Sequence, residues 1–127
     1  MTPSRPLSGR TILVVEDEQL VAMLIEDALV DAGAIVMGAA ATVAEALMLL
    51  GTSVPDVAVM DMNLCGQSAA PVADALAARG VPFLVATGYG AAGLPKGHES
   101  APVLAKPFDP NDLIRQLVAL AARPPAA

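Results

Sequence analysis

Acidic, hydroxyl and basic side chains stand at the ends of four short apolar runs in this chain. Glu16 and Asp17 follow the first run, Asp61 follows the second, Thr87 ends the third and Lys106 follows the last. Clustered carboxylates repel one another unless a cation neutralises them, and Mg²⁺ prefers carboxylate and phosphate oxygens. An ammonium and a hydroxyl can hold phosphoryl oxygens, and an aspartate can itself attack phosphorus. If these residues meet, they predict magnesium-dependent phosphoryl transfer.

The apolar runs have the length of buried strands. They cover Ile12–Val15, Val57–Met60, Phe83–Ala86 and Val103–Ala105, and Ala34–Gly38 is a weaker candidate. Strands that are apolar throughout are typical of parallel sheets covered on both faces. We therefore expect these runs to form the centre of the domain.

Segments with helical spacing of apolar residues separate most of these strands. We expect helices over Gln19–Ala32, from Thr42 to about Leu50, from about Pro71 to Arg79, and after Asp109. Gly33 fits a helix C-terminus, Thr42 with Glu45 fits a capping box, and Asp109 before Pro110 fits an N-cap. Polar residues with Gly66 and Ser68 predict a loop after Asp61.

The alternation of strands and helices predicts an α/β fold with a five-stranded parallel sheet and helices on both faces. Ligands bind such sheets at the carboxyl ends of the strands, where the four polar motifs lie. We expect one domain over residues 10–122, with a flexible N-terminal segment over 1–9 and a flexible tail over 123–127.

Residues 88–102 break the alternation. Four glycines and an internal proline make any helix there short or unstable, since a helical Gly costs roughly 1 kcal/mol and Pro roughly 3 relative to Ala. We expect a mobile segment beside the site. His98, the only histidine of the chain, is expected to be a solvated loop residue.

Composition excludes several classes of function. The net charge is −6, with 7 basic residues against 13 acidic ones, which argues against nucleic-acid binding. No apolar stretch approaches the roughly 20 residues of a membrane span, and no secretory signal is recognisable. Cys65 is the only cysteine, so no intrachain disulfide can form. We expect a cytoplasmic protein without membrane or nucleic-acid partners.

Four motifs, in this order, resemble those of the receiver domain of two-component response regulators. They are Val14-Val15-Glu16-Asp17-Glu18, Asp61-Met62-Asn63-Leu64, Ala86-Thr87-Gly88 and Lys106-Pro107-Phe108. The resemblance covers about residues 10–122. It implies a doubly wound, CheY-like and flavodoxin-like three-layer sandwich with strand order 2-1-3-4-5.

The resemblance also implies the chemistry of the site. Asp61 would accept a phosphoryl group from a phosphohistidine of a histidine kinase or a histidine phosphotransfer protein. Asp17, Asp61 and the backbone carbonyl of Asn63 would bind Mg²⁺, while Glu16 would act directly or through water. The domain would catalyse only its own phosphorylation and dephosphorylation, so it would not be an enzyme for other substrates.

Further residues take roles from the same resemblance. Thr87 and Lys106 would bind the phosphoryl group after transfer, and the Lys106–Pro107 peptide bond would be cis. Val103 stands where most receivers carry a switch Tyr or Phe, so the usual coupling between threonine and an aromatic ring cannot operate. We expect the switch to be ordering or repacking of residues 88–102, with Tyr89 as a mobile aromatic.

A narrower resemblance rests on Pro82-Phe83-Leu84-Val85-Ala86-Thr87-Gly88-Tyr89 and on the lack of Pro after Leu64. These features are similar to the FAT GUY receivers, which occur mainly in alphaproteobacteria, often beside kinases of the HWE type. A single-domain bacterial response regulator that acts on a downstream protein target is the leading interpretation.

Three other classes of function fit these residues less well. A phosphatase of the haloacid dehalogenase type would carry a second aspartate two residues after the nucleophile, where this chain has Asn63. An unphosphorylated, receiver-like scaffold would not need the intact Asp61 and Lys106. A nucleotide-binding module would carry a glycine-rich phosphate loop, and the chain has neither of the common forms.

Overall fold

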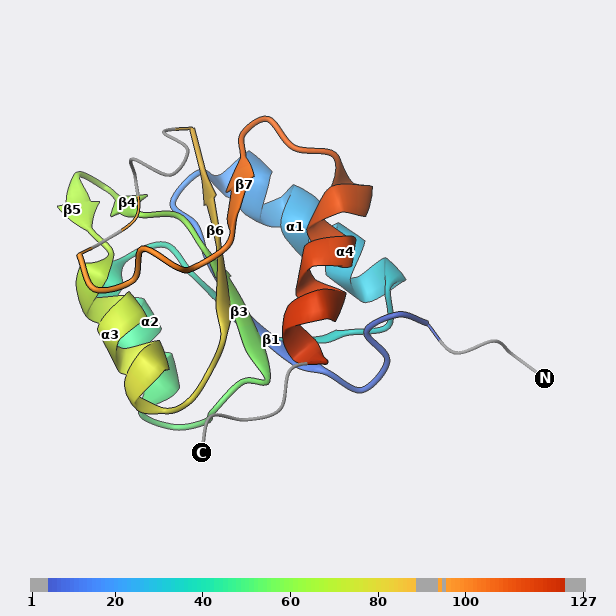
Figure 1. Ribbon diagram of the computed structural model, residues 1–127, viewed down its shortest axis with the longest axis horizontal. Helices are drawn as coiled ribbons and strands as arrows, with labels where there is room; N and C mark the ends of the chain where they lie inside the picture. Colours follow the sequence, from blue (N-terminus) through green and yellow to red (C-terminus); the bar gives the residue numbers. More distant parts are fainter. Residues whose placement is uncertain (1–4, 89–93, 95, 123–127) are drawn as a thin grey trace.

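Five parallel strands form the central sheet of the computed structural model, which describes residues 5–88, 94 and 96–122 (Figure 1). Their order across the sheet is β2-β1-β3-β6-β7, and every neighbouring pair is parallel. The strands are β1 (Thr11–Val15), β2 (Ile35–Ala40), β3 (Val57–Met60), β6 (Phe83–Thr87) and β7 (Val103–Ala105). When only these strands are numbered, the order is 2-1-3-4-5, which confirms the predicted topology.

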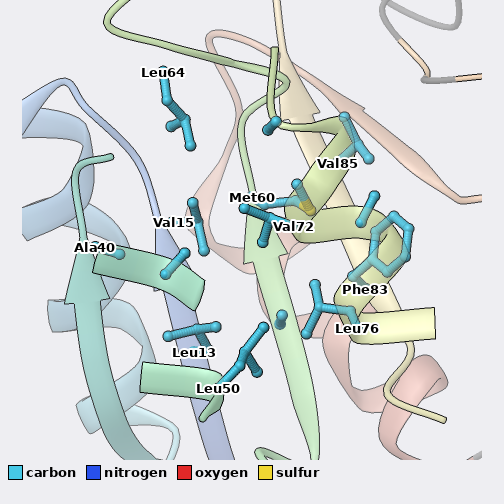
Figure 2. Packing of buried hydrophobic residues seen from close by; sticks show 14 of the residues in the cluster. Leu13, Val15, Ala40, Leu50, Met60, Leu64, Val72, Leu76, Phe83 and Val85 are labelled. Atoms are coloured by element: carbon cyan, nitrogen blue, oxygen red, sulfur yellow. The ribbon is translucent and has the colours of Figure 1, made fainter. Parts of the chain in front are cut away.

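Helices cover both faces of the sheet and complete the three-layer sandwich. The four helices of the described residues are α1 (Gln19–Asp31), α2 (Val43–Leu50), α3 (Ala70–Ala78) and α4 (Pro110–Ala121). Strand β1 contributes residues to the hydrophobic core on each side of the sheet, because successive side chains of a strand point to opposite faces. Leu13 and Val15 pack with residues of α2 and α3 (Figure 2), whereas Ile12 and Val14 pack with residues of α1 and α4.

Local sequence signals set the helix ends, as predicted. The Thr42 hydroxyl accepts a hydrogen bond from the Glu45 N–H at 3.1 Å, and the Asp109 carboxylate accepts one from the Asn111 N–H at 2.8 Å. Gly33 follows α1 with a φ of +87°, a conformation that glycine adopts without steric cost. Each predicted helix end lies within two residues of the observed one.

The segment after Asp61 forms a small β-hairpin where the sequence predicted only a polar loop. Strands β4 (Asn63–Leu64) and β5 (Gln67–Ser68) pair antiparallel across Cys65 and Gly66. The φ angles of these two turn residues are +53° and +84°. Two left-handed residues in succession match the turn that best fits the twist of a two-residue hairpin. Leu64 is fully buried and anchors the hairpin to the core.

The packed structure begins before residue 10. Leu7 is fully buried, its N–H donates to the Ala32 carbonyl at 2.9 Å, and the Gly9 N–H donates to the Gly33 carbonyl at 3.3 Å. The sequence placed residues 5–9 in a flexible segment, but they close the end of α1 instead. None of the helices in the described part of the chain is long and apolar enough to cross a membrane.

The described residues between β6 and β7 form turns and no helix. Within the segment predicted to be mobile, Tyr89 and residues 90–93 and 95 lie outside the described residues. His98 is described, and its expected solvation is wrong: its side chain is only 14% exposed and lies 2.7 Å from the Asp74 carboxylate. Val103 is half-buried and packs against the core on the α2 and α3 side.

Candidate functional site

The carboxyl edge of the sheet brings the predicted site residues together. The Asp61 N–H donates to the Val15 carbonyl at 2.9 Å, and the Lys106 N–H donates to the Thr87 carbonyl at 3.0 Å. Backbone bonding between strands therefore continues to the residues that carry the polar side chains. Parallel pairing aligns the strand ends, which is why residues far apart in sequence share one edge.

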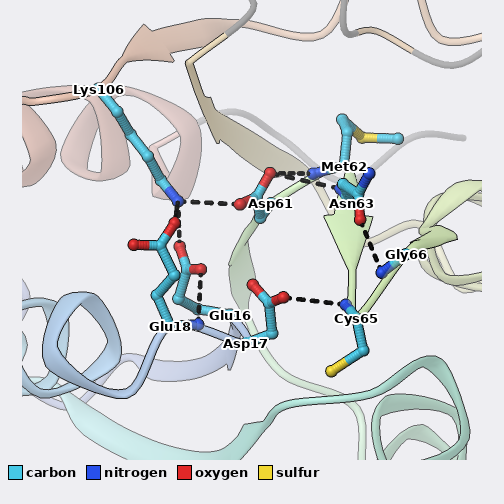
Figure 3. Close-up of polar contacts among 9 residues, drawn as sticks. All are labelled: Glu16, Asp17, Glu18, Asp61, Met62, Asn63, Cys65, Gly66 and Lys106. Atoms are coloured by element: carbon cyan, nitrogen blue, oxygen red, sulfur yellow. Dashed lines mark hydrogen bonds and ion pairs between the residues drawn. The ribbon is translucent and has the colours of Figure 1, made fainter.

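The Lys106 ammonium lies at the centre of the acidic group (Figure 3). Its Nζ lies 2.6 Å from Glu16 Oε1, 2.9 Å from Asp61 Oδ2 and 3.7 Å from Glu18 Oε1. The Glu16 side chain is 1% exposed, so burial raises the pKa of its carboxyl, and the Lys106 bond only partly offsets this effect. Burial alone would lower the pKa of Lys106, but hydrogen bonds to the two acids raise it. The ammonium thus offsets part of the negative charge of the site.

Backbone amides fix the second oxygen of Asp61. Its Oδ1 accepts hydrogen bonds from the Met62 N–H at 2.7 Å and from the Asn63 N–H at 3.4 Å. Its Oδ2 faces Lys106 (Figure 3). Because both oxygens have donors, the carboxylate is held in one orientation at the wall of a cavity. A positioned carboxylate of this kind can serve as a nucleophile.

Three acids gather within reach of a single cation, and one of them was not predicted. One carboxylate oxygen each from Glu16, Glu18 and Asp61 lies within 4.8 Å of the others. Glu18 belongs to the acidic run that the sequence singled out, but only its side-chain conformation shows that it reaches the cluster. Oxygen ligands of this type suit a hard cation such as Mg²⁺, so the donor set is chemically suitable for that ion.

Asp17 and Asn63 line the same cavity but bond to the hairpin. Asp17 Oδ2 accepts the Cys65 N–H at 2.9 Å, and this bond lowers the pKa of the Asp17 carboxyl. Asn63 Oδ1 accepts the Gly66 N–H at 3.0 Å. Of the predicted metal ligands, Glu16 and Asp61 therefore share the cluster, while the Asp17 carboxylate points to the turn (Figure 3).

A cavity of about 790 Å³ opens in front of Asp61 and Lys106. Its lining combines polar groups with apolar side chains of α1 and of the turn after β7: Val21, Leu24, Pro107 and Phe108. The Lys106–Pro107 peptide bond is cis, as the resemblance implied. Thr87 is fully buried at the end of β6. The cavity can admit a side chain of a partner protein to the acidic site.

Comparisons with known proteins agree with this geometry. The family model of the response regulator receiver domain matches residues 12–118. Among solved structures, SdrG from Sphingomonas melonis Fr1 is 40% identical over 94% of this chain and 98% of its own, with a TM-score of 0.77. The receiver domain of PhyR from Erythrobacter litoralis is 27% identical over 94% of this chain and 98% of that domain, with a TM-score of 0.79.

A longer relative shows how the chain compares in length. PhyR from Brucella abortus is 28% identical over 93% of this chain, with a TM-score of 0.79, but the match covers only 49% of PhyR. The chain thus spans about half the length of that protein. A search of curated proteins found no match. The family model covers most of the chain, and the strand order is the one expected for this family. The chain therefore belongs to the family of response regulator receiver domains.

Proposed function

We propose that this receiver domain takes a phosphoryl group onto the Asp61 carboxylate from a phosphohistidine of a partner protein. An Asp61 oxygen forms the new bond to phosphorus while the N–P bond of the phosphohistidine breaks. The electron pair stays on the imidazole, which takes a proton from solvent. The observation that carries this proposal is the Asp61 carboxylate, held between two backbone amides and the Lys106 ammonium at the wall of an open cavity.

The surrounding residues have separate parts in this step. Lys106 supplies positive charge to the phosphoryl oxygens, and Thr87 at the end of the neighbouring strand supplies a hydroxyl. Glu16, Asp17, Asp61 and the backbone carbonyl of Asn63 would hold Mg²⁺. When bound, this ion neutralises charge on the transferred group. The acid cluster supports a cation site, and Glu18 adds a carboxylate to it.

The cavity wall supports a protein as phosphodonor. Its apolar residues stand directly beside the acids, and the exposed residues of α1 next to Leu24 include Leu20 and Met23, which are 81% and 51% exposed. A histidine kinase or a histidine phosphotransfer protein would cover this surface while its phosphohistidine enters. We assign the chain to the FAT GUY subgroup on its Pro82–Tyr89 motif, with a kinase of the HWE type as the proposed partner.

The phosphorylated domain would act through altered contacts with a downstream protein. Val103 is half-buried on β7 and has no aromatic ring to move toward Thr87. The proposed switch is therefore ordering or repacking of residues 88–102, with Tyr89 as the aromatic residue that moves. This segment joins β6 to β7, the strands whose ends carry Thr87 and Lys106.

Asn63 disfavours a hydrolase of the haloacid dehalogenase type. Its side chain is an amide, which cannot serve as general acid or base, and its oxygen is already bonded to the Gly66 N–H. The protein would therefore catalyse only reactions of its own Asp61. A scaffold that is never phosphorylated would not need the Asp61 carboxylate positioned at the wall of an open cavity.

Intact mass after incubation with Mg²⁺ and acetyl phosphate tests the proposal. We expect one added phosphoryl group, lost in Asp61→Asn and retained in Asp31→Asn, a matched change at an exposed position at the end of α1. Repeated turnover of phosphate esters would show a hydrolase instead. If neither acetyl phosphate nor a phosphorylated kinase gives an adduct, the protein is an unphosphorylated scaffold and the proposal is wrong.

A further inference from the structure

Described residues of the crossover from β6 to β7 pack on the face of the sheet that carries α3. The crossover from β6 to β7 has no helix in its described residues, and residues 96–102 run in turns instead. Figure 1 shows this stretch, in orange, passing α3 before it enters β7. We call residues 96–102 the strap. Among the described residues of the crossover, only Leu94 and Ala101 pack against the core cluster, whereas a helix would bury a full apolar stripe.

One side chain fastens the strap to the rest of the domain. His98 Nε2 lies 2.7 Å from Asp74 Oδ1 of α3, and the His98 ring meets the ring of Phe83 edge-on, with centroids 5.6 Å apart. His98 is 14% exposed, so its contacts are largely shielded from water, although Asp74 is 70% exposed. The His98 carbonyl also accepts the Ala101 N–H at 3.1 Å.

A hollow borders the strap. Its volume is about 180 Å³, and its lining includes Ala77 of α3 and Phe83 of β6. The strap supplies further lining residues, among them His98 and Pro102. Strap residues that face empty space make few packing contacts on that side. Gly97, with a φ of +90°, provides a pivot at the start of the strap.

We propose that the strap opens and closes as one local unit and that the bond between His98 and Asp74 is its latch. Opening exposes the buried ring of Phe83 without unfolding the sheet. The far end stays anchored, because the Val85 N–H donates to the Pro102 carbonyl at 3.0 Å and Val103 pairs with β6. Local units of this kind open at a lower free energy than the whole domain.

Amide hydrogen exchange of the unmodified protein, followed by NMR, tests the latch. We expect His98→Ala and Asp74→Ala each to raise the opening population seen at the Ala101 amide by about threefold to tenfold, the usual net worth of one intramolecular hydrogen bond. Asp74→Ala also improves helix propensity, so faster exchange cannot come from a weaker α3. Asp27→Ala, an exposed change within α1, is the matched control and should leave Ala101 unchanged.

Two more variants separate the latch from ring packing and from general destabilisation. His98→Phe keeps an aromatic ring near Phe83 but removes the bond, so it should open the strap. The double variant of His98 and Asp74 should exchange no faster than the more strongly affected single variant, because both lose the same bond. Unchanged exchange at Ala101, additive effects, or equal acceleration in β1 would overturn the proposal.

Discussion

Lys106 Nζ lies 2.6 Å from Glu16 Oε1, although the two residues are 90 positions apart in the chain. The contact joins the loop after the first strand to the loop after the last one. It also places a cation in the acid cluster, beside the proposed phosphoacceptor Asp61. The ammonium therefore stabilises the fold and prepares the site for a phosphoryl group.

Removal of this cation should weaken the fold in the absence of Mg²⁺. Lys106→Met leaves the buried Glu16 and Asp61 carboxylates without their common donor, which should lower the free energy of unfolding by about 2 kcal/mol at neutral pH. Urea denaturation measures the change. Lys96→Met, the same change at an exposed lysine, should stay within about 0.5 kcal/mol of the parent. Equal or greater stability of Lys106→Met would contradict the role given to the ammonium.

The same substitution should strengthen Mg²⁺ binding if the proposed cation site is correct. Without a competing ammonium a few ångströms away, the acids should bind Mg²⁺ about tenfold more tightly or better. Isothermal titration calorimetry gives the dissociation constants, with Lys96→Met as control. Asp61→Asn should weaken binding, because it removes a carboxylate from the cluster. Weaker binding by Lys106→Met would exclude competition between the two cations.

The turn of the β-hairpin should depend on glycine at one position. A side chain at Gly66 would meet no atom within 4 Å, so Gly66→Ala costs only the left-handed φ of +84°, about 1 kcal/mol of unfolding free energy. Gly88→Ala is the matched control, because that position is equally open and its φ is not left-handed. Urea denaturation of both variants separates backbone strain from crowding, and equal losses would contradict this explanation.

Leu7 tests where the folded domain begins. Leu7→Ala should lower the free energy of unfolding by about 3 kcal/mol, since it removes a fully buried side chain from the core beneath α1. Leu20→Ala changes a residue that is 81% exposed and should have an effect below about 0.5 kcal/mol. Thermal or urea unfolding distinguishes the two outcomes. Similar small effects in both variants would show that residues 5–9 contribute little.

Sequence alone determined the sheet and the composition of most of the site. Apolar runs of three or four residues that alternate with helical segments indicate buried strands, and parallel strands align their carboxyl ends, so Glu16, Asp61 and Lys106 were expected to converge. Capping residues such as Thr42 and Asp109 act on amides two or three positions away, and such local signals are readable without a fold. For the sheet, its strand ends and the helix caps, the order of residues in the chain is enough to predict the arrangement.

Tertiary structure alone decided which side chains meet where sequence separation gives no signal. Leu7 is buried against the core near the end of α1, and His98 contacts Asp74 of α3. Glu18 joins the acid cluster while Asp17 bonds to the hairpin, a choice made by side-chain conformation and by the Cys65 amide. These contacts depend on packing between distant segments, which no local pattern in the sequence specifies.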